Sequence, residues 1–301
     1  MTPTRPLCIG IGEVLWDLLP GGKKLGGAPA NFAYHIHACG AHGQIVSAVG
    51  DDPHGREILD RLTSWGLSTD LIATTSAVTG TVTVRLDSKR VPEFIIHEHV
   101  AWDNIPLTDT AQQQVATAKA VCFGTLGQRS EVSRNTIRAL VKRAKPQSLK
   151  VLDLNLRQRY FSKNVIDASL RLANVLKLND EELLTVGDLL EVTGTPQEQM
   201  RELADLYQLT TVILTRGEEG SLILRDEEWF DHPGIRTDVV DTVGAGDAFT
   251  AATIIGLLAN WSLEEISDHA NQLAAHVCTQ PGATPELPDA LRAPFAKAFS
   301  S

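Results

Sequence analysis

The chain has 301 residues, of which 43% are apolar and 21% are charged, and its formal net charge is −10. This length and composition predict a globular protein built as one large domain, or as a domain with a smaller attachment. Because 27 basic residues stand against 37 acidic ones, the chain lacks the basic excess that binding to nucleic acid or an anionic membrane needs. We therefore expect neither as a partner.

Nothing in the sequence predicts a targeting or membrane segment. The apolar stretches Leu149–Leu156 and Ala251–Ala259 are interrupted or too short to span a bilayer. Residues 1–7 have no apolar run behind positive charge, so we expect no signal peptide. The cysteines lie far apart without a CxxC pair, which predicts four buried, reduced thiols of a cytoplasmic protein rather than a disulfide or metal framework. They are Cys8, Cys39, Cys122 and Cys278.

Short apolar runs alternate with helical patterns along the chain. The first run, Leu7–Gly12, ends in glycine, as a buried strand that leads into a loop would. The other predicted strands of this kind are Gln44–Val49, Ala120–Gly124, Lys150–Leu154, Asn174–Leu178 and Thr211–Thr215. The predicted helices between them are Ala30–Cys39, Gly55–Trp65, Asp109–Ala118, Val132–Ala144, Ser162–Leu172, Asp180–Val186 and Gln197–Leu206. This alternation predicts an α/β fold with a mostly parallel central sheet sandwiched by helices.

Two neighbouring segments break this alternation. Thr79–Asp87 and Glu93–His99 have the pattern of strands joined by a short turn, with no helix between them. They form either a hairpin outside the parallel sheet, which could cover an active site as a lid, or an antiparallel edge of the main sheet. The periodicity alone leaves both alternatives open.

The C-terminal part begins with a second predicted hairpin, Leu222–Leu224 with Glu228–Phe230, followed by a β-branched strand at Thr237–Val240. Two helices, Ala245–Asn260 and Leu263–Thr279, are predicted after it. No repeat, low-complexity run or polar linker divides the sequence, so we expect residues 1–301 to form a single domain.

The most informative stretch is DTVGAGDAFTAA, from position 241 to 252. Gly244, Ala245 and Gly246 leave backbone N–H groups uncovered at a helix N-terminus, where the helix dipole favours an anion such as phosphate. Asp247 lies in the first helical turn and is suited to accept the proton of a hydroxyl that attacks phosphorus. The structural alternative is that Asp247 only caps the helix and the glycines form a tight turn.

Two N-terminal features could bind a polyhydroxylated substrate. In LGGAPANFA, Gly27 permits close backbone approach and Asn31 offers both a donor and an acceptor, although the same pattern also begins ordinary helices. In GEVLWDLLP, Asp17 is surrounded by apolar residues. It is either a hydroxyl-binding group in a pocket or a loop cap.

Further polar residues follow buried strands in the middle of the chain. In DLNLR, Asp153, Asn155 and Arg157 share one side if the strand continues, at the end where open α/β sheets bind ligands. Arg157 would then hold a sugar hydroxyl or a phosphate, or else pair with Asp153. Asn179 and Glu182 in LNDEE either begin an N-capped acidic helix or lie near a hydrated Mg²⁺.

Other phosphate motifs are absent. The sequence has no GxxxxGK[ST], and Gly10-Ile11-Gly12 lacks the third glycine of a dinucleotide fingerprint because position 15 is leucine. TRGEEGS, from position 215 to 221, fits either backbone contact with a nucleotide or a plain hairpin turn. A dinucleotide-binding dehydrogenase is therefore disfavoured.

The motifs GGAPANFA, LNDEE, TRGEEGS and DTVGAGDAF, in this order, resemble the ribokinase-like (PfkB-type) carbohydrate kinases over essentially the whole chain. The resemblance implies a mostly parallel sheet between helices, with a small β lid formed by residues 13–25 and 72–102 over the sugar. It also implies an enzyme that transfers the γ-phosphoryl group of ATP to a sugar hydroxyl with the help of Mg²⁺.

The resemblance implies roles for individual residues. Asp247 would be the catalytic base, and the backbone of Gly244, Ala245 and Gly246 would stabilise charge on the transferred phosphoryl group. The other residues implied to bind the sugar are Asp17, Gly27, Asn31 and Arg157. Those implied to line the nucleotide site are Asn179, Thr215, Gly217, Gly220 and Asn271. Those implied to hold cations are Glu182 for Mg²⁺ through water, and Asp241, Val243 and Gly282 for a monovalent cation, often potassium.

Within this family, the segments around Asp17, Asn31 and Arg157, together with VAWDNI, look most like bacterial fructokinases. D-Fructose is therefore the leading substrate, and 2-keto-3-deoxygluconate, ribose and nucleosides are the alternatives. The chain departs from the fructokinase pattern in offering His97, Glu98 and His99 where a lid arginine is expected. A non-catalytic sugar or nucleotide sensor is the alternative of another class. A homodimer that pairs through the lid is expected.

The negative charge of the chain is local. Residues 178–228 hold 13 acidic and 3 basic residues, a balance of −10, and the remaining chain has 24 of each sign. Such a segment repels the phosphates of ATP. Phosphate binding must therefore depend on the cradle at 244–246 and on bound cations, which predicts a strong Mg²⁺ requirement.

Overall fold

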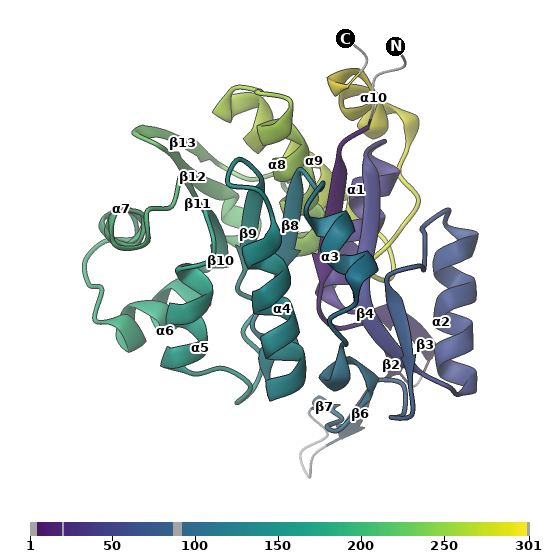
Figure 1. The fold of residues 1–301 in the computed structure, drawn as a ribbon. Helices are drawn as coiled ribbons and strands as arrows, with labels where there is room; N and C mark the ends of the chain where they lie inside the picture. Colours follow the sequence, from purple (N-terminus) through teal and green to yellow (C-terminus); the bar gives the residue numbers. More distant parts are fainter. Residues whose placement is uncertain (1–4, 20, 87–91, 300–301) are drawn as a thin grey trace.

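The computed structural model describes residues 5–19, 21–86 and 92–299. These residues form a nine-stranded sheet of order β13-β12-β11-β10-β9-β8-β1-β4-β5 and a four-stranded sheet of order β3-β2-β6-β7 (Figure 1). The strands of the large sheet are β1 (Leu7–Ile11), β4 (His42–Gly50), β5 (Ile72–Thr75), β8 (Ala120–Phe123), β9 (Leu149–Asp153), β10 (Val175–Asn179), β11 (Thr211–Thr215), β12 (Ser221–Arg225) and β13 (Glu228–His232). Those of the small sheet are β2 (Leu15–Leu19), β3 (Gly22–Gly26), β6 (Thr81–Leu86) and β7 (Pro92–Ile96).

Helices connect and cover the strands of the large sheet. They are α1 (Ala28–Ala38), α2 (Pro53–Ser64), α3 (Asp109–Val115), α4 (Glu131–Arg143), α5 (Lys163–Leu170), α6 (Asp180–Leu190), α7 (Pro196–Tyr207), α8 (Ala245–Leu258), α9 (Leu263–Cys278) and α10 (Asp289–Ala298). Short 3₁₀ turns are η1 (Ala101–Asn104), η2 (Leu126–Gln128) and η3 (Gly217–Glu219). The predicted α/β sandwich is confirmed.

The large sheet is parallel from β11 to β5 and antiparallel only at β12 and β13. Its order reverses at β1, which pairs with β4 on one side and β8 on the other. In open α/β sheets, ligands bind outside the carboxyl ends of the strands at such a reversal. The topology therefore predicts a ligand site at the loops that follow β1 and β8.

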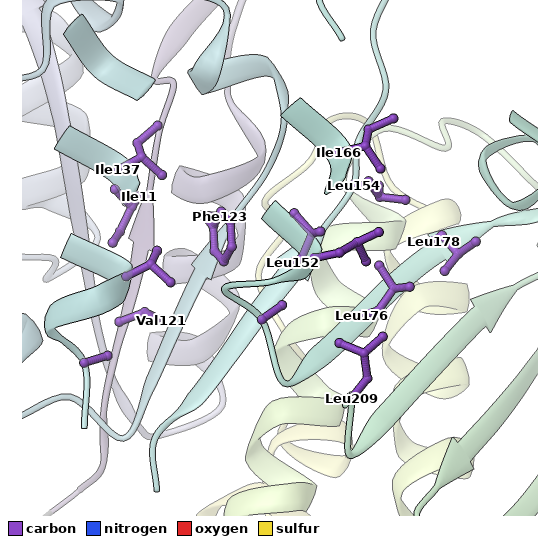
Figure 2. Packing of buried hydrophobic residues seen from close by; sticks show 14 of the residues in the cluster. Ile11, Val121, Phe123, Ile137, Leu152, Leu154, Ile166, Leu176, Leu178 and Leu209 are labelled. Atoms are coloured by element: carbon purple, nitrogen blue, oxygen red, sulfur yellow. The ribbon is translucent and has the colours of Figure 1, made fainter. Parts of the chain in front are cut away.

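Two apolar cores lie on the two faces of this sheet. On one face, strand residues such as Ile11, Phe123 and Leu176 pack with side chains of α3 to α7 (Figure 2). On the other face, Cys122 and Val151 pack with side chains of α1, α8 and α9. Both faces of each central strand are buried, which explains why these strands have continuous apolar sequences instead of alternating ones.

The hairpin that broke the alternation lies outside the large sheet. β6 and β7 pair antiparallel, and β6 pairs parallel with β2, so the hairpin belongs to the four-stranded sheet at the lower side of Figure 1. The predicted lid segment 72–102 begins too early, because Ile72–Thr75 pairs with β4 in the large sheet. The predicted turn falls mainly on residues 87–91, outside the described residues. We call the four-stranded sheet the lid sheet.

Several local expectations were wrong. The predicted strand Thr237–Val240 is a loop, because it pairs with no strand among the described residues and Val239 and Val240 are exposed. The strand β5 and the helix α10 were not predicted, whereas β2 and most of β3 lie in the expected lid segment 13–25. Cys278 is partly exposed, whereas the other cysteines are buried, and all four are free thiols. None of the helices in the described part of the chain is long and apolar enough to cross a membrane.

An ion pair between Arg129 and Asp103 joins the segment after the lid sheet to the body. Arg129 donates from Nε and Nη2 to the two carboxylate oxygens of Asp103 at 2.7 and 2.8 Å, and both side chains are less than 10% exposed. The guanidinium also lies 3.8 Å from the ring centre of Trp102. Such a bidentate pair is geometrically specific, and its loss leaves a buried charge without its partner.

We predict that Asp103→Asn lowers the free energy of unfolding by about 3–5 kcal/mol, because the Arg129 charge stays buried without its counter-ion. Urea denaturation monitored by circular dichroism measures this change. Asp51→Asn is the matched control, since it breaks an ion pair with Arg56 whose side chains are 81% and 62% exposed, and such pairs contribute little. Equal effects of the two substitutions would contradict the prediction.

Candidate active site

A small cavity lies at the carboxyl ends of β1 and β8, where the order of the large sheet reverses. The loops after these strands, the start of α1 and the first turn of α8 surround it. Its lining residues are Glu13, Ala28, Pro29, Phe32, Cys122, Phe123, Gly124, Asp153 and Asp247. Of the predicted site residues, Asp247 therefore lies in the cavity itself. Glu13 was not predicted as a site residue, although an acidic residue directly after the apolar run 7–12 could have indicated it.

Asp247 contacts the other end of the sequence through Asn31. Asn31 Nδ2 donates to Asp247 Oδ2 at 2.8 Å, which joins α1 to α8. Asp247 keeps part of its surface open to the cavity, and protein surrounds the rest. Burial, together with the nearby Asp153 carboxylate, raises the pKa of Asp247 to about 7, although Asn31 and Lys177 oppose the rise. A carboxyl group with this pKa can accept a proton near neutral pH and release it again.

A second carboxyl group, that of Glu13, is 3% exposed in the same cavity. Burial raises its pKa to about 7, and the charge of Asp247 adds to the rise. The two carboxyl groups therefore interact, so that the charge of Asp247 opposes the ionisation of Glu13.

Lys177 supplies the positive charge beneath these carboxylates. Its Nζ donates to Asp153 Oδ1 at 3.0 Å, and Thr250 Oγ1 donates to Asp153 Oδ2 at 2.8 Å. Burial by itself would lower the pKa of Lys177, but the carboxylates of Asp153, Glu182 and Asp247 raise it, so Lys177 stays charged. The predicted alternative, a pair between Asp153 and Arg157, is wrong because Lys177 takes that place. A lysine inside the apolar run VLKLN was the signal for it.

The predicted anion cradle is the first turn of α8. Gly244 is the N-cap, with φ +81°, and it provides no side-chain cap for the helix. A Cβ on Gly244 would lie 2.5 Å from the Cβ of Ala283, so only glycine fits there. A Cβ on Gly246 would lie 3.0 Å from Lys177 Nζ. The start of the α8 dipole and the buried Lys177 ammonium thus lie at one place, which suits an anion, and the Ala245 N–H there donates to the Thr242 carbonyl oxygen at 3.3 Å.

The other predicted sugar-binding residues border this region. Asp17 lies on β2, burial raises its pKa to about 6, and the charges of Lys24 and Arg157 oppose the rise. Gly27 has φ +110° and begins α1. Arg157 is exposed in the loop after β9, which ends at Asp153, and Asn155 has φ +48°. The strand does not continue to Arg157, so the condition for Asp153, Asn155 and Arg157 to share one side is not met. The Arg157 charge nevertheless acts on Glu13 and Asp247.

The predicted nucleotide residues follow the next strands of the sheet. Asn179 and Thr215 are register partners at the carboxyl ends of β10 and β11. Gly217 and Gly220 have φ +55° and +81° in the loop after β11, and a Cβ on Gly217 would meet open space. Asn271 is buried in α9, where its Nδ2 donates to Ser221 Oγ at 2.9 Å and to the Ser267 carbonyl oxygen at 2.8 Å.

Glu182 forms a capping box with Asn179. Its two carboxylate oxygens accept backbone N–H groups of Leu156 at 2.8 Å and Asn179 at 3.0 Å, and the Glu182 N–H donates to Asn179 Oδ1 at 2.9 Å. This is the structural alternative that LNDEE predicted, so a role for Glu182 towards Mg²⁺ stays a prediction. Among the residues that the structure describes, no three His, Cys, Asp or Glu side chains gather as a metal-binding cluster.

Asp241 joins the loop before the cradle to the loop around Gly282. Asp241 Oδ1 accepts the Val243 N–H at 3.1 Å, and Oδ2 accepts the Gly282 N–H at 3.0 Å. Lys24 Nζ, from the lid strand β3, also donates to Oδ2 at 3.0 Å. Burial by itself would raise the pKa of Asp241, but these hydrogen bonds hold that pKa below its usual value. The three residues predicted around a monovalent cation are thus together, with an ammonium group beside them that was not predicted.

The arrangement of a cradle, a carboxyl group of raised pKa and a lid sheet can be compared with known proteins. A family model described as pfkB family carbohydrate kinase matches residues 21–290. The chain belongs to this family. It is a sugar kinase of the ribokinase-like fold, as the motifs predicted.

Individual relatives cover nearly the whole kinase. An uncharacterized sugar kinase of Pyrococcus horikoshii is 31% identical over 305 residues, or 94% of each chain. Its crystal structure has a TM-score of 0.84 over 98% of this chain and 100% of that one, and it has also been solved in complex with ATP. A fructokinase of Salmonella typhimurium is 28% identical, over 92% of this chain and 95% of its own. A fructokinase of Vibrio cholerae, solved with fructose, ADP and potassium, is 24% identical with a TM-score of 0.80 over 98% and 99% of the two chains, a likeness of fold alone.

We predict that Asp247→Asn stabilises the protein at neutral pH. Because the pKa of Asp247 is about 7 in the fold and 3.8 without it, the folded state binds more protons between these values, and stability falls as pH rises through this window. Asparagine removes the ionisation and still accepts from Asn31. The gain should be absent below pH 4 and reach at most about 4 kcal/mol above pH 7.

Thermal melting of both proteins from pH 4 to pH 8.5 measures this gain. Asp60→Asn, at an exposed position of α2, serves as the control and should show no such pH dependence. If the melting temperatures of Asp247→Asn and the unsubstituted protein differ by the same amount at every pH, the prediction is contradicted.

Proposed function

We propose that this kinase transfers the γ-phosphoryl group of ATP to the 6-hydroxyl of D-fructose. The family and the fructokinases among its relatives support this activity, and the solved ATP complex of the Pyrococcus relative supports the donor. The observation that carries the proposal is a carboxyl group with a pKa of about 7, Asp247, placed in the first turn of an open helix N-terminus. A proton acceptor and an anion site then act on the same hydroxyl and phosphoryl group.

An unsatisfied acceptor supports a hydroxylated substrate beside Asp247. Asn31 Oδ1 is buried, and no described residue donates a hydrogen bond to it, while Nδ2 of the same side chain donates to Asp247. A buried acceptor without a partner is costly, and a substrate hydroxyl would remove that cost. Asp17 and Gly27 are proposed to bind further hydroxyls of the sugar, and Arg157 is proposed to bind the sugar or the transferred phosphoryl group.

The proposed chemistry is a direct transfer. The substrate oxygen forms a bond to the γ-phosphorus as the bond from that phosphorus to the bridging oxygen of ADP breaks. Asp247 takes the hydroxyl proton, and the N–H groups of Gly244, Ala245 and Gly246 stabilise the negative charge on the transferred group. Lys177 adds positive charge below Gly246. The raised pKa of Asp247 keeps its basicity matched to neutral pH.

The nucleotide is proposed to lie across the loops after β10 and β11. Asn179, Thr215, Gly217, Gly220 and Asn271 would line it, with open space at Gly217 for close approach. Glu182 is proposed to hold Mg²⁺ through water, since each of its carboxylate oxygens already accepts a backbone N–H group. When bound, Mg²⁺ would neutralise phosphate charge that the acidic segment 178–228 otherwise repels. We expect activity to vanish in excess chelator.

We predict that Asp247→Asn lowers kcat by at least a hundredfold with little change in nucleotide affinity, because only the proton acceptor is lost. In the unsubstituted enzyme, kcat/KM should rise as pH increases from 6 to 8, with an apparent pKa near 7, since the ionised form of Asp247 is the active one. Near-normal turnover of Asp247→Asn would contradict the assignment of the base.

A coupled assay of ADP release tests the substrate. It compares D-fructose with 2-keto-3-deoxygluconate, ribose and nucleosides as acceptors. Turnover of another acceptor in preference to fructose would correct the substrate and leave the mechanism intact. Sugar binding by calorimetry without any ADP release would instead support a non-catalytic sensor. A cytoplasmic location for the kinase also stays a prediction.

We propose that the protein is a homodimer paired through the lid sheet. The sheet order leaves β3 and β7 as its edges within the described residues, and Phe94 of β7 is 53% exposed. Open strand edges with apolar side chains favour pairing with a second chain. Light scattering should give about twice the chain mass of 32.6 kDa, whereas a mass near 32.6 kDa would contradict the dimer.

A further inference from the structure

We propose that the ammonium group of Lys24 takes the place of a monovalent cation beside the anion cradle, so that this kinase works without potassium. Lys24 is then a positioning residue that acts through Asp241 and does not touch the reacting atoms. The expected effect of salt on the reaction rate rests on the proposed function, because it is measured as phosphoryl transfer. The structural consequence, the exclusion of a cation at Asp241, does not depend on it.

The proposal rests on the contacts of Asp241. Its carboxylate accepts three hydrogen bonds: the N–H of Val243, the N–H of Gly282 and the ammonium of Lys24, at 3.0 to 3.1 Å. The two backbone groups present donors, not oxygen atoms, to this carboxylate. These N–H groups stabilise the negative charge of Asp241, as the ammonium of Lys24 does. Among the residues that the structure describes, Lys24 provides the positive charge that forms an ion pair with Asp241.

A potassium ion at this carboxylate would compete with Lys24. Both cations would need Asp241 Oδ2, which Lys24 Nζ already contacts at 3.0 Å while its side chain is 40% exposed. The Asp241 side chain is 20% exposed, so water screens the repulsion between two adjacent cations only in part. The stem of Lys24 also covers Gly282, where a Cβ would lie 3.5 Å from Lys24 Cδ. The lysine therefore lies against Gly282 as well as supplying the charge.

The position of Asp241 connects this charge to the cradle. Asp241 precedes Gly244 by three residues, and Gly244 packs against Ala283, the neighbour of Gly282. The Asp241 carboxylate thus ties together the two loops that set the first turn of α8. A cation that neutralises Asp241 allows these loops to stay together without leaving a net negative charge beside an anion site.

The charge also comes from the lid sheet. Lys24 lies on β3 directly opposite Asp17 of β2, and its charge acts on the pKa of Asp17. The bond between Lys24 and Asp241 therefore joins the strand pair that carries a proposed sugar-binding carboxylate to the loop that carries the cradle. A free potassium ion would make no such connection to the lid sheet.

Kinetics in defined salts test the proposal. Phosphoryl transfer is measured with tetramethylammonium or potassium as the only monovalent cation at equal ionic strength. The unsubstituted enzyme should change less than twofold between the salts. Lys24→Met should lose at least tenfold in tetramethylammonium and recover part of that loss in potassium, whereas Lys24→Arg should stay independent of the salt. Lys23→Met, which removes the neighbouring lysine of the same strand, should behave as the unsubstituted enzyme.

Anomalous scattering from thallium(I)-soaked crystals provides the readout that needs no activity. We expect no thallium peak at Asp241 in the unsubstituted protein and a peak there in Lys24→Met. A peak beside Asp241 in the unsubstituted protein, or severalfold activation of that protein by potassium, would overturn the proposal. So would a Lys24→Met variant that matches the unsubstituted enzyme in both salts and binds no thallium. If no acceptor is phosphorylated in any salt, the proposed function fails, and the thallium result alone decides the role of Lys24.

Discussion

Lys177 donates to Asp153 between two neighbouring parallel strands, and the carboxylates of Glu182 and Asp247 act on the same ammonium group. The side chains of Lys177 and Asp153 are 9% and 7% exposed. A buried charge of either sign needs a partner, and here one cation faces three carboxylates. Burial, together with the negative charge of Asp153 in this cluster, raises the pKa of Asp247 to about 7.

The glycines of the site are required by close backbone contacts and not by charge. Gly244 and Gly27 have positive φ angles, and each packs so closely on a neighbouring backbone that a Cβ would come within 2.6 Å of it. These contacts bring the first turns of α1 and α8 to the same cavity, where Asn31 and Asp247 meet. The glycines thus permit the close approach of these backbones, and they leave the first turn of α8 without a side-chain cap.

Much of the large sheet could be predicted, because its central strands are apolar on both faces and are separated by amphipathic helices. The short lid strands β2 (LWDLL) and β3 (GKKLG) show no clear alternation over five residues, so only the family resemblance placed residues 13–25 in the lid. Thr237–Val240 shows the opposite error. Its β-branched residues favour a strand, but strand formation needs a partner edge, and none is placed beside it.

The sequence by itself determined the motifs and their order, and with them the family, the cradle and the acidic residue at the first turn of α8. Those features are local, since a glycine-rich turn and a following helix are encoded within about ten residues. Only the tertiary structure decided which charges meet. Lys177 with Asp153, Asn31 with Asp247 and Lys24 with Asp241 are separated by 24, 216 and 217 positions in the chain. Their pairing depends on strand order and helix packing, which no short stretch of sequence contains.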